Sequence, residues 1–106
     1  MAKAHIKAGS CGFTVDVVAT LQDKRTVNLE IASDCPNLEP LIQELKQVDP
    51  YYEVEPRSDK ARIRPLVNEH LQHCASCPAP IGILKAVEVA AGFAVPKDVH
   101  IELSRE

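Results

Sequence analysis

Three stretches in the first third of the chain have the pattern of strands: residues 3–8 alternate between apolar and polar, residues 13–21 form an extended run rich in valine and threonine, and residues 25–32 alternate again. The third is the clearest, because valine, leucine and isoleucine fall on one side while threonine, asparagine and glutamate fall on the other. A period of two is typical of a strand with one buried face, so the pattern predicts three strands. Gly9 and Gly12 separate the first two and predict a bend or bulge there.

The period then changes to that of helices. Apolar residues over 38–48 predict a first helix, with Asn37 as N-cap because Pro40 then falls where a proline costs no hydrogen bond. A second helix is predicted from Pro65 to about residue 74. A third has Cys77 as N-cap and ends near residue 92.

The remaining segments complete the predicted fold. Asp49 and Pro50 would end the first helix, and residues 51–63 are predicted to form irregular polar surface with a short extended piece over 52–55. Residues 99–103 alternate again and predict a last strand. We therefore expect an α+β fold, a mainly antiparallel sheet of three to four strands with about three helices packed on one face. No repeat or composition break appears in the 106 residues, which predicts a single domain over residues 1–106.

Charge and composition exclude several classes of function. Twelve Lys and Arg against fifteen Asp and Glu give a net charge of −3, which argues against a nucleic-acid partner. The chain has no apolar run long enough to span a membrane and no apolar block of a signal peptide, so we expect a cytoplasmic protein without a membrane partner. No paired carboxylates, Ser/His/Asp set or glycine-rich phosphate loop is present. Whether the protein is an enzyme stays open from sequence.

The four cysteines are the residues most suited to a chemical role. In a reducing compartment they favour metal ligation or thiol chemistry over disulfides. Each lies at the edge of a predicted element: Cys11 at the glycine bend, Cys35 at the strand-to-helix turn, Cys74 at a helix end and Cys77 at a helix start. Turns of this kind can converge at one end of a sheet. Cys74 and Cys77 also form a Cys-x-x-Cys pair, which can clasp a metal. The pattern therefore predicts one metal centre held by all four cysteines.

The residues around the cysteines favour an iron–sulfur cluster over zinc, because proline follows both Cys35 and Cys77, as it does after some cluster ligands. The function would be electron transfer, cluster handling or metal-stabilised binding of a protein partner. One alternative is a redox protein or enzyme that uses Cys77 or Cys35 as a thiolate, which the start of a helix favours. Another is an interaction module with inert cysteines. His70 and His73 are expected to be satisfied by water and the helix dipole, although a ligand role stays open.

Three motifs resemble an uncharacterised family of small four-cysteine proteins from anaerobic bacteria and methanogens: Gly9-Ser10-Cys11-Gly12-Phe13, Ser33-Asp34-Cys35-Pro36-Asn37 and Cys74-Ala75-Ser76-Cys77-Pro78-Ala79-Pro80. The likeness covers nearly the whole chain and implies no activity. The order of the cysteines is also similar to that of the domain named for its Thr-Ser-Cys-Pro-Asp motif. That resemblance implies a cysteine-bound metal or a thiol role, although Ala75 and Ala79 replace the threonine and aspartate of the motif.

Overall fold

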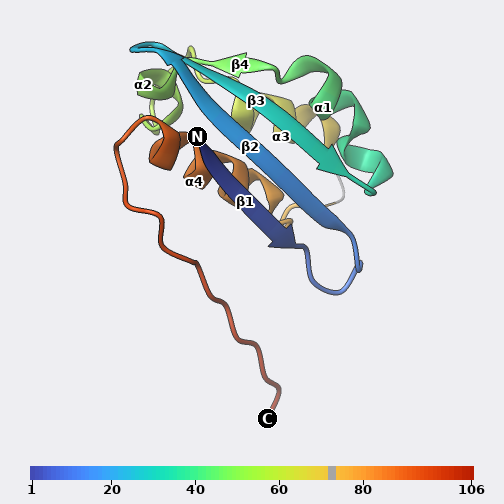
Figure 1. Ribbon diagram of the computed structural model, residues 1–106. Helices are drawn as coiled ribbons and strands as arrows, with labels where there is room; N and C mark the ends of the chain where they lie inside the picture. Colours follow the sequence, from blue (N-terminus) through green and yellow to red (C-terminus); the bar gives the residue numbers. More distant parts are fainter. Residues whose placement is uncertain (72–73) are drawn as a thin grey trace.

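The computed structural model describes residues 1–71 and 74–106 (Figure 1). Its sheet has four antiparallel strands in the order β1-β2-β3-β4, so that neighbours in sequence are neighbours in the sheet. The strands are β1 (Ala2–Lys7), β2 (Thr14–Asp23), β3 (Thr26–Ser33) and β4 (Gln47–Val48). The first three confirm the predicted strands with small differences at their ends.

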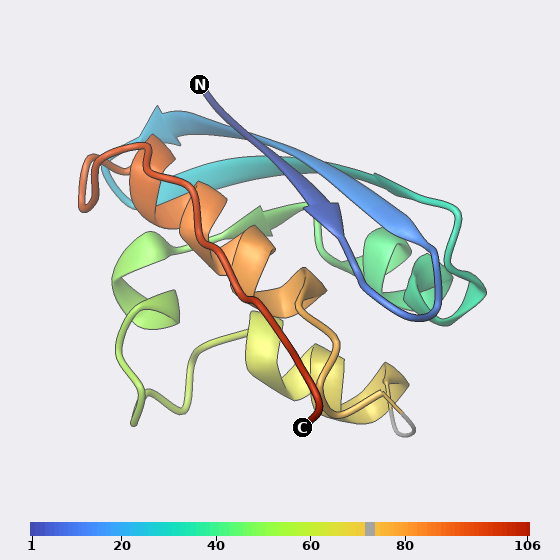
Figure 2. The same cartoon turned by 90° about the horizontal axis from the view of Figure 1, so that it is seen from below.

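Helices cover one face of this sheet, as Figure 2 shows from below. They are the 3-10 helix η1 (Pro36–Leu38), α1 (Glu39–Glu44), α2 (Pro50–Glu53), α3 (Ile63–His70) and α4 (Ala79–Ala90). The predicted α+β class, with an antiparallel sheet and helices on one face, is therefore confirmed. No helix in the described part of the chain is both long and apolar enough to cross a membrane.

The core lies between the sheet and the helices. Val15, Val17 and Val27 point from the strands toward buried residues of the helices, among them Leu41 and Ile83. Burying a side chain of this size stabilises the fold by about 1.5–3 kcal/mol. The packed layers hold the loops at the two ends of the sheet in fixed positions relative to each other.

The first helix is shorter than predicted. It ends at Glu44, and the chain then enters β4, where Val48 pairs with Val27 of β3. The Leu29 N–H donates to the Lys46 carbonyl at 2.8 Å. This carbonyl therefore bonds to β3, whereas in a longer helix it would have accepted an N–H of the helix itself. The apolar residues predicted to lie on one helical face over 38–48 are still buried at Leu45 and Val48. Val48, however, belongs to a strand and not to the helix.

The segment after β4 is also different from the prediction. Residues 50–53 form the short helix α2 instead of an extended piece, because Asp49 caps it by accepting the Tyr51 N–H at 3.0 Å. Proline at the first position of α2 starts a helix here, whereas we expected it only to end one. Glu53 is buried, and its carboxylate accepts the N–H groups of Arg62 and Ile63 at 2.7 and 3.0 Å. Those bonds set the start of α3 ahead of Pro65.

The predicted last strand is absent. Residues 96–106 have no regular structure and run away from the sheet after α4 (Figure 1). Their alternating pattern fits a strand, but a strand also needs a neighbouring edge for its backbone groups, and this segment meets none in the described structure. The fourth strand of the sheet is β4.

Candidate metal centre

Cys11 lies in the loop that joins β1 to β2. The loop is closed by the Ala8 N–H, which donates to the Phe13 carbonyl at 3.0 Å, and by the Gly12 N–H, which donates to the Gly9 carbonyl at 3.0 Å. Both glycines have positive φ, 101° and 79°, a conformation in which a side chain would be strained. The predicted bend is confirmed, and it presents Cys11 exposed at the end of the sheet.

Cys35 follows β3 and is half-buried. Its N–H donates to the Ser33 hydroxyl at 3.1 Å, and that hydroxyl donates to the Thr14 carbonyl at 2.7 Å. Cys35 is itself the N-cap of η1, so our placement of the cap at Asn37 is wrong. The 3-10 turn takes up three residues before α1 begins, so Pro40 is only the second residue of α1, where a missing N–H costs no hydrogen bond within the helix.

Cys74 and Cys77 are the two ends of one turn. The Cys77 N–H donates to the Cys74 carbonyl at 3.0 Å, and the Cys74 N–H donates to the Leu71 carbonyl at 3.1 Å. Helix α3 ends at His70, so Cys74 lies beyond its end and not in its last turn. The N-cap of α4 is Pro78, one residue after the predicted cap, which leaves Cys77 directly before it.

These turns bring all four cysteines to one pocket of about 240 Å³. Its apolar base includes the buried residues Val15, Leu38 and Leu71. The full lining is Ala8, Ser10, Cys11, Phe13, Val15, Cys35, Asn37, Leu38, Leu71, Cys74, Ser76 and Cys77. Ligation by these cysteines stays a prediction, but the convergence of four separate positions in sequence is a property of the fold.

The thiols are electrostatic neighbours. Burial raises the pKa of Cys77, and a hydrogen bond from the Ala79 N–H opposes part of that shift. The negative forms of Cys35, Cys74 and Cys11 raise the pKa of Cys77 further by repulsion. A cation in the pocket would reverse this repulsion, since it would stabilise the thiolates together.

A polar side chain supports one of these sulfurs. The Asn37 amide donates from Nδ2 to Cys74 Sγ at 3.7 Å, which is a suitable distance for a hydrogen bond to sulfur. Sequence reasoning treated Asn37 only as a helix cap and missed this contact. Its place two residues after Cys35 was the available signal, because it puts a hydrogen-bond donor near the cysteines, and such donors support metal ligands.

The four sulfurs are not drawn tightly together. Among residues 1–71 and 74–106, the only set of three or more possible ligands with donor atoms all within 4.8 Å of one another is Glu44, Glu69 and His70. That set lies between α1 and α3, where His70 Nε2 is 3.3 Å from Glu44 Oε1. We expected water and the helix dipole to satisfy His70, and the structure gives it the Glu44 carboxylate as a partner. His73 lies outside the described residues.

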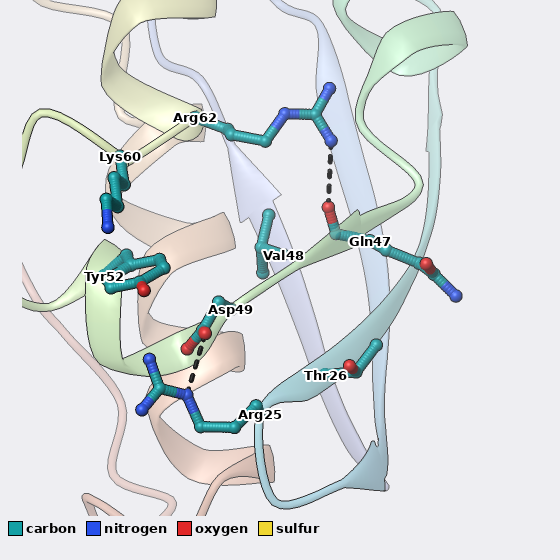
Figure 3. Close-up of a pocket in the computed structure, with 8 residues that line it drawn as sticks. All are labelled: Arg25, Thr26, Gln47, Val48, Asp49, Tyr52, Lys60 and Arg62. Carbon is teal, nitrogen blue, oxygen red and sulfur yellow. Dashed lines mark hydrogen bonds and ion pairs between the residues drawn. The ribbon is translucent and has the colours of Figure 1, made fainter.

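A second pocket, of about 330 Å³, lies at the other end of β3 (Figure 3). It is lined by Arg25, Thr26, Gln47, Val48, Asp49, Tyr52, Lys60 and Arg62. Arg25 Nε donates to Asp49 Oδ2 at 2.8 Å, and this bond raises the pKa of the guanidinium. Arg62 donates to the carbonyls of Gln47 and Glu44 at 3.1 and 3.2 Å.

A family model matches residues 2–103 of the chain, which include all four cysteines. The chain belongs to DUF6951, a family of unknown function. No curated protein and no solved structure matches it. The predicted membership of an uncharacterised family is thus confirmed. Because the description of DUF6951 names no activity, the function has to be argued from the geometry of the cysteine pocket.

Proposed function

We propose that this DUF6951 protein binds one metal centre through Cys11, Cys35, Cys74 and Cys77. The observation that carries the proposal is that four separately placed cysteines line a single pocket at one end of the sheet. Inert cysteines would have no reason to gather there, since a buried cysteine acts as a small apolar residue wherever the core needs one. Four thiolates are the usual ligand set of both structural zinc and iron–sulfur clusters.

The spacing of the sulfurs supports a cluster ahead of a single zinc ion. Zinc–sulfur bonds of about 2.3 Å in a tetrahedron place the sulfurs roughly 3.8 Å apart. No three of the cysteine sulfurs lie within 4.8 Å of one another. An iron–sulfur cluster distributes its thiolates over several iron atoms, so it accommodates sulfurs that are farther apart. Binding of zinc would instead require the sulfurs to come closer together.

A catalytic thiol is the second candidate, and two observations count against it. Burial and the neighbouring thiols raise the pKa of Cys77, which lowers the fraction of reactive thiolate. In the thioredoxin arrangement the helix starts at the first cysteine of the pair, whereas α4 starts at Ala79, after the second. The position of Cys35 as the N-cap of η1 favours this candidate, as does the hydrogen bond from the Ala79 N–H to Cys77.

The placement of the ligands fits electron transfer or transfer of a cluster to a protein partner in the reducing cytoplasm. Cys11 is exposed, while the other three cysteines are half-buried and pack against the core. A partner could therefore approach the centre from the side of the β1–β2 loop. The similarity in cysteine order to the Thr-Ser-Cys-Pro-Asp domain agrees with a metal or thiol role and adds no substrate.

The test is to purify the protein without air and measure iron, zinc, acid-labile sulfide and the absorption spectrum. We expect iron with sulfide in the native chain, and at least about tenfold less metal in Cys77→Ser, because a lost ligand costs more than a lost supporting contact. Ser76→Ala is the matched control, since Ser76 lines the same pocket without a thiol. Equal metal content in Cys77→Ser and the native protein would reject the proposal. Zinc without sulfide would reject the cluster but keep the site.

A further inference from the structure

The C-terminal segment 98–103 combines an exposed apolar surface with the pattern of a strand. Val99, Ile101 and Leu103 are 56%, 73% and 93% exposed. They alternate with His100 and Glu102, so that an extended segment places all three on one side. The DUF6951 match continues to residue 103, which makes the segment part of the family domain. Apolar residues in such a pattern indicate a surface that is covered in the working molecule.

An open sheet edge of the same length is present in the structure. Strand β1 is at the end of the strand order and pairs only with β2, so one row of its backbone N–H and carbonyl groups has no strand partner in the described residues. β1 has six residues, Ala2–Lys7, as does segment 98–103. An open edge of this kind can accept a further strand.

The two segments are complementary in charge and in apolar residues. Lys3 and Lys7 are exposed along β1, and Asp98 and Glu102 lie on the polar side of the tail. On the opposite side, β1 carries Ala4 and Ile6, which are only partly buried. In a paired strand these two would lie beside the three apolar residues of the tail. Opposite charges and apolar neighbours across strands both stabilise a sheet.

We propose that two copies of this chain form a dimer in which the tail of each copy adds as a strand to β1 of the other. A second copy is favoured over the molecule's own edge because the tail runs away from its own sheet (Figures 1 and 2). A reciprocal exchange uses both tails and both edges, so the assembly closes at two copies. The proposal uses none of the cysteines and stands independently of the metal centre.

The experiment is sedimentation equilibrium over a range of concentrations. We expect a dimer for the native chain and a monomer for the variant with Ile101→Asp and Leu103→Asp, which alters only exposed side chains. Val95→Asp is the matched control, because Val95 is 76% exposed but lies before the strand segment, and this variant should remain dimeric. A native chain that is monomeric at every concentration would overturn the proposal. A monomer with slowly exchanging amides over 98–103 would do so too, and would indicate docking on its own edge.

Exchanging the charges between β1 and the tail tests the proposed strand pair more directly. Lys3→Glu with Lys7→Glu should weaken the dimer by at least about tenfold through like-charge repulsion along the new strand pair. Adding Asp98→Lys and Glu102→Lys in the same chain should restore it. All these variants keep the four cysteines, so a dimer bridged by metal would survive every one of them. Dimerisation that is indifferent to the charges and to Ile101→Asp with Leu103→Asp would therefore contradict the exchange of tails.

Discussion

The two ends of strand β3 carry two different kinds of pocket. At the start of the strand, the pocket around Arg25 and Arg62 is the larger, at about 330 Å³ against about 240 Å³ for the cysteine pocket at the other end. Its charged groups already have partners within the chain: Arg25 pairs with Asp49, and Arg62 donates to two backbone carbonyls. The Lys60 ammonium lies 5.2 Å from the centre of the Tyr52 ring, as a cation–π contact.

The comparison teaches that the chemistry left available, and not the volume, identifies the candidate site. The donors and acceptors of the Arg25 pocket already form hydrogen bonds that join β4, α2 and the loop before α3. Their role is therefore structural. The cysteine pocket gathers four thiols, and burial together with the neighbouring thiols opposes ionisation of Cys77 unless a cation joins them. A ligand would gain few new hydrogen bonds in the Arg25 pocket, whereas a cation in the cysteine pocket would stabilise neighbouring thiolates.

The largest expected effect is a difference in stability between the two ends on binding metal. We expect anaerobic reconstitution with iron and sulfide to slow hydrogen exchange of the amides in the cysteine turns, Gly12, Leu38 and Cys77, by about 100-fold at a metal concentration near 100 times Kd. The amides of Tyr51 and Tyr52, which donate to Asp49, should change much less. Equal slowing at both ends would break the comparison, because the metal would then act on the whole fold.

The next effect concerns the end without the cysteines. Glu53→Ala removes a buried carboxylate that holds two N–H groups at the start of α3, so we expect a loss of about 2 kcal/mol in the free energy of unfolding. Urea titration measures it. Glu55→Ala is the control, since Glu55 is exposed and, among the described residues, its carboxylate interacts with Arg57 alone. A loss no larger than that of the control would show that Glu53 does not organise this end.

The strands were predictable because each has one buried face, and the third has a clear period of two in Val27, Leu29 and Ile31. The fourth strand was not, because Val48 continues a helical stripe in sequence and only pairing with Val27 makes it a strand. The tail was predicted as a strand by the same alternation. Its pattern describes one face of a strand but not whether an edge is available to pair with it.

The four cysteines that line the candidate site were predicted to converge, but the contacts that support them were not. Cysteines at the ends of elements pointed to convergence, because loops at one end of a layered fold approach each other. The supporting contacts depended on tertiary packing: Asn37 reaches Cys74 across 37 positions in sequence, and Glu53 reaches Ile63 across ten. No local pattern encodes such pairs. The 3-10 turn after Cys35 was not predicted, because Pro40 was used to place the N-cap at Asn37, whereas the turn lets Cys35 be a cap with Pro40 still in the first turn of α1.

The smallest expected effect sharpens the comparison with two asparagines near opposite ends of β3. Asn37 donates to Cys74 Sγ, whereas Asn28 donates to Gln22 Oε1 at 3.0 Å. We expect Asn37→Ala to weaken metal binding by about tenfold, because a donor to a ligating sulfur stabilises its thiolate form, and Asn28→Ala to leave it unchanged. Competition with a chelator measures both affinities. If the two variants lost affinity equally, the effect would come from a general loosening of the sheet. If neither lost any, the hydrogen bond from Asn37 to Cys74 would not contribute to metal affinity.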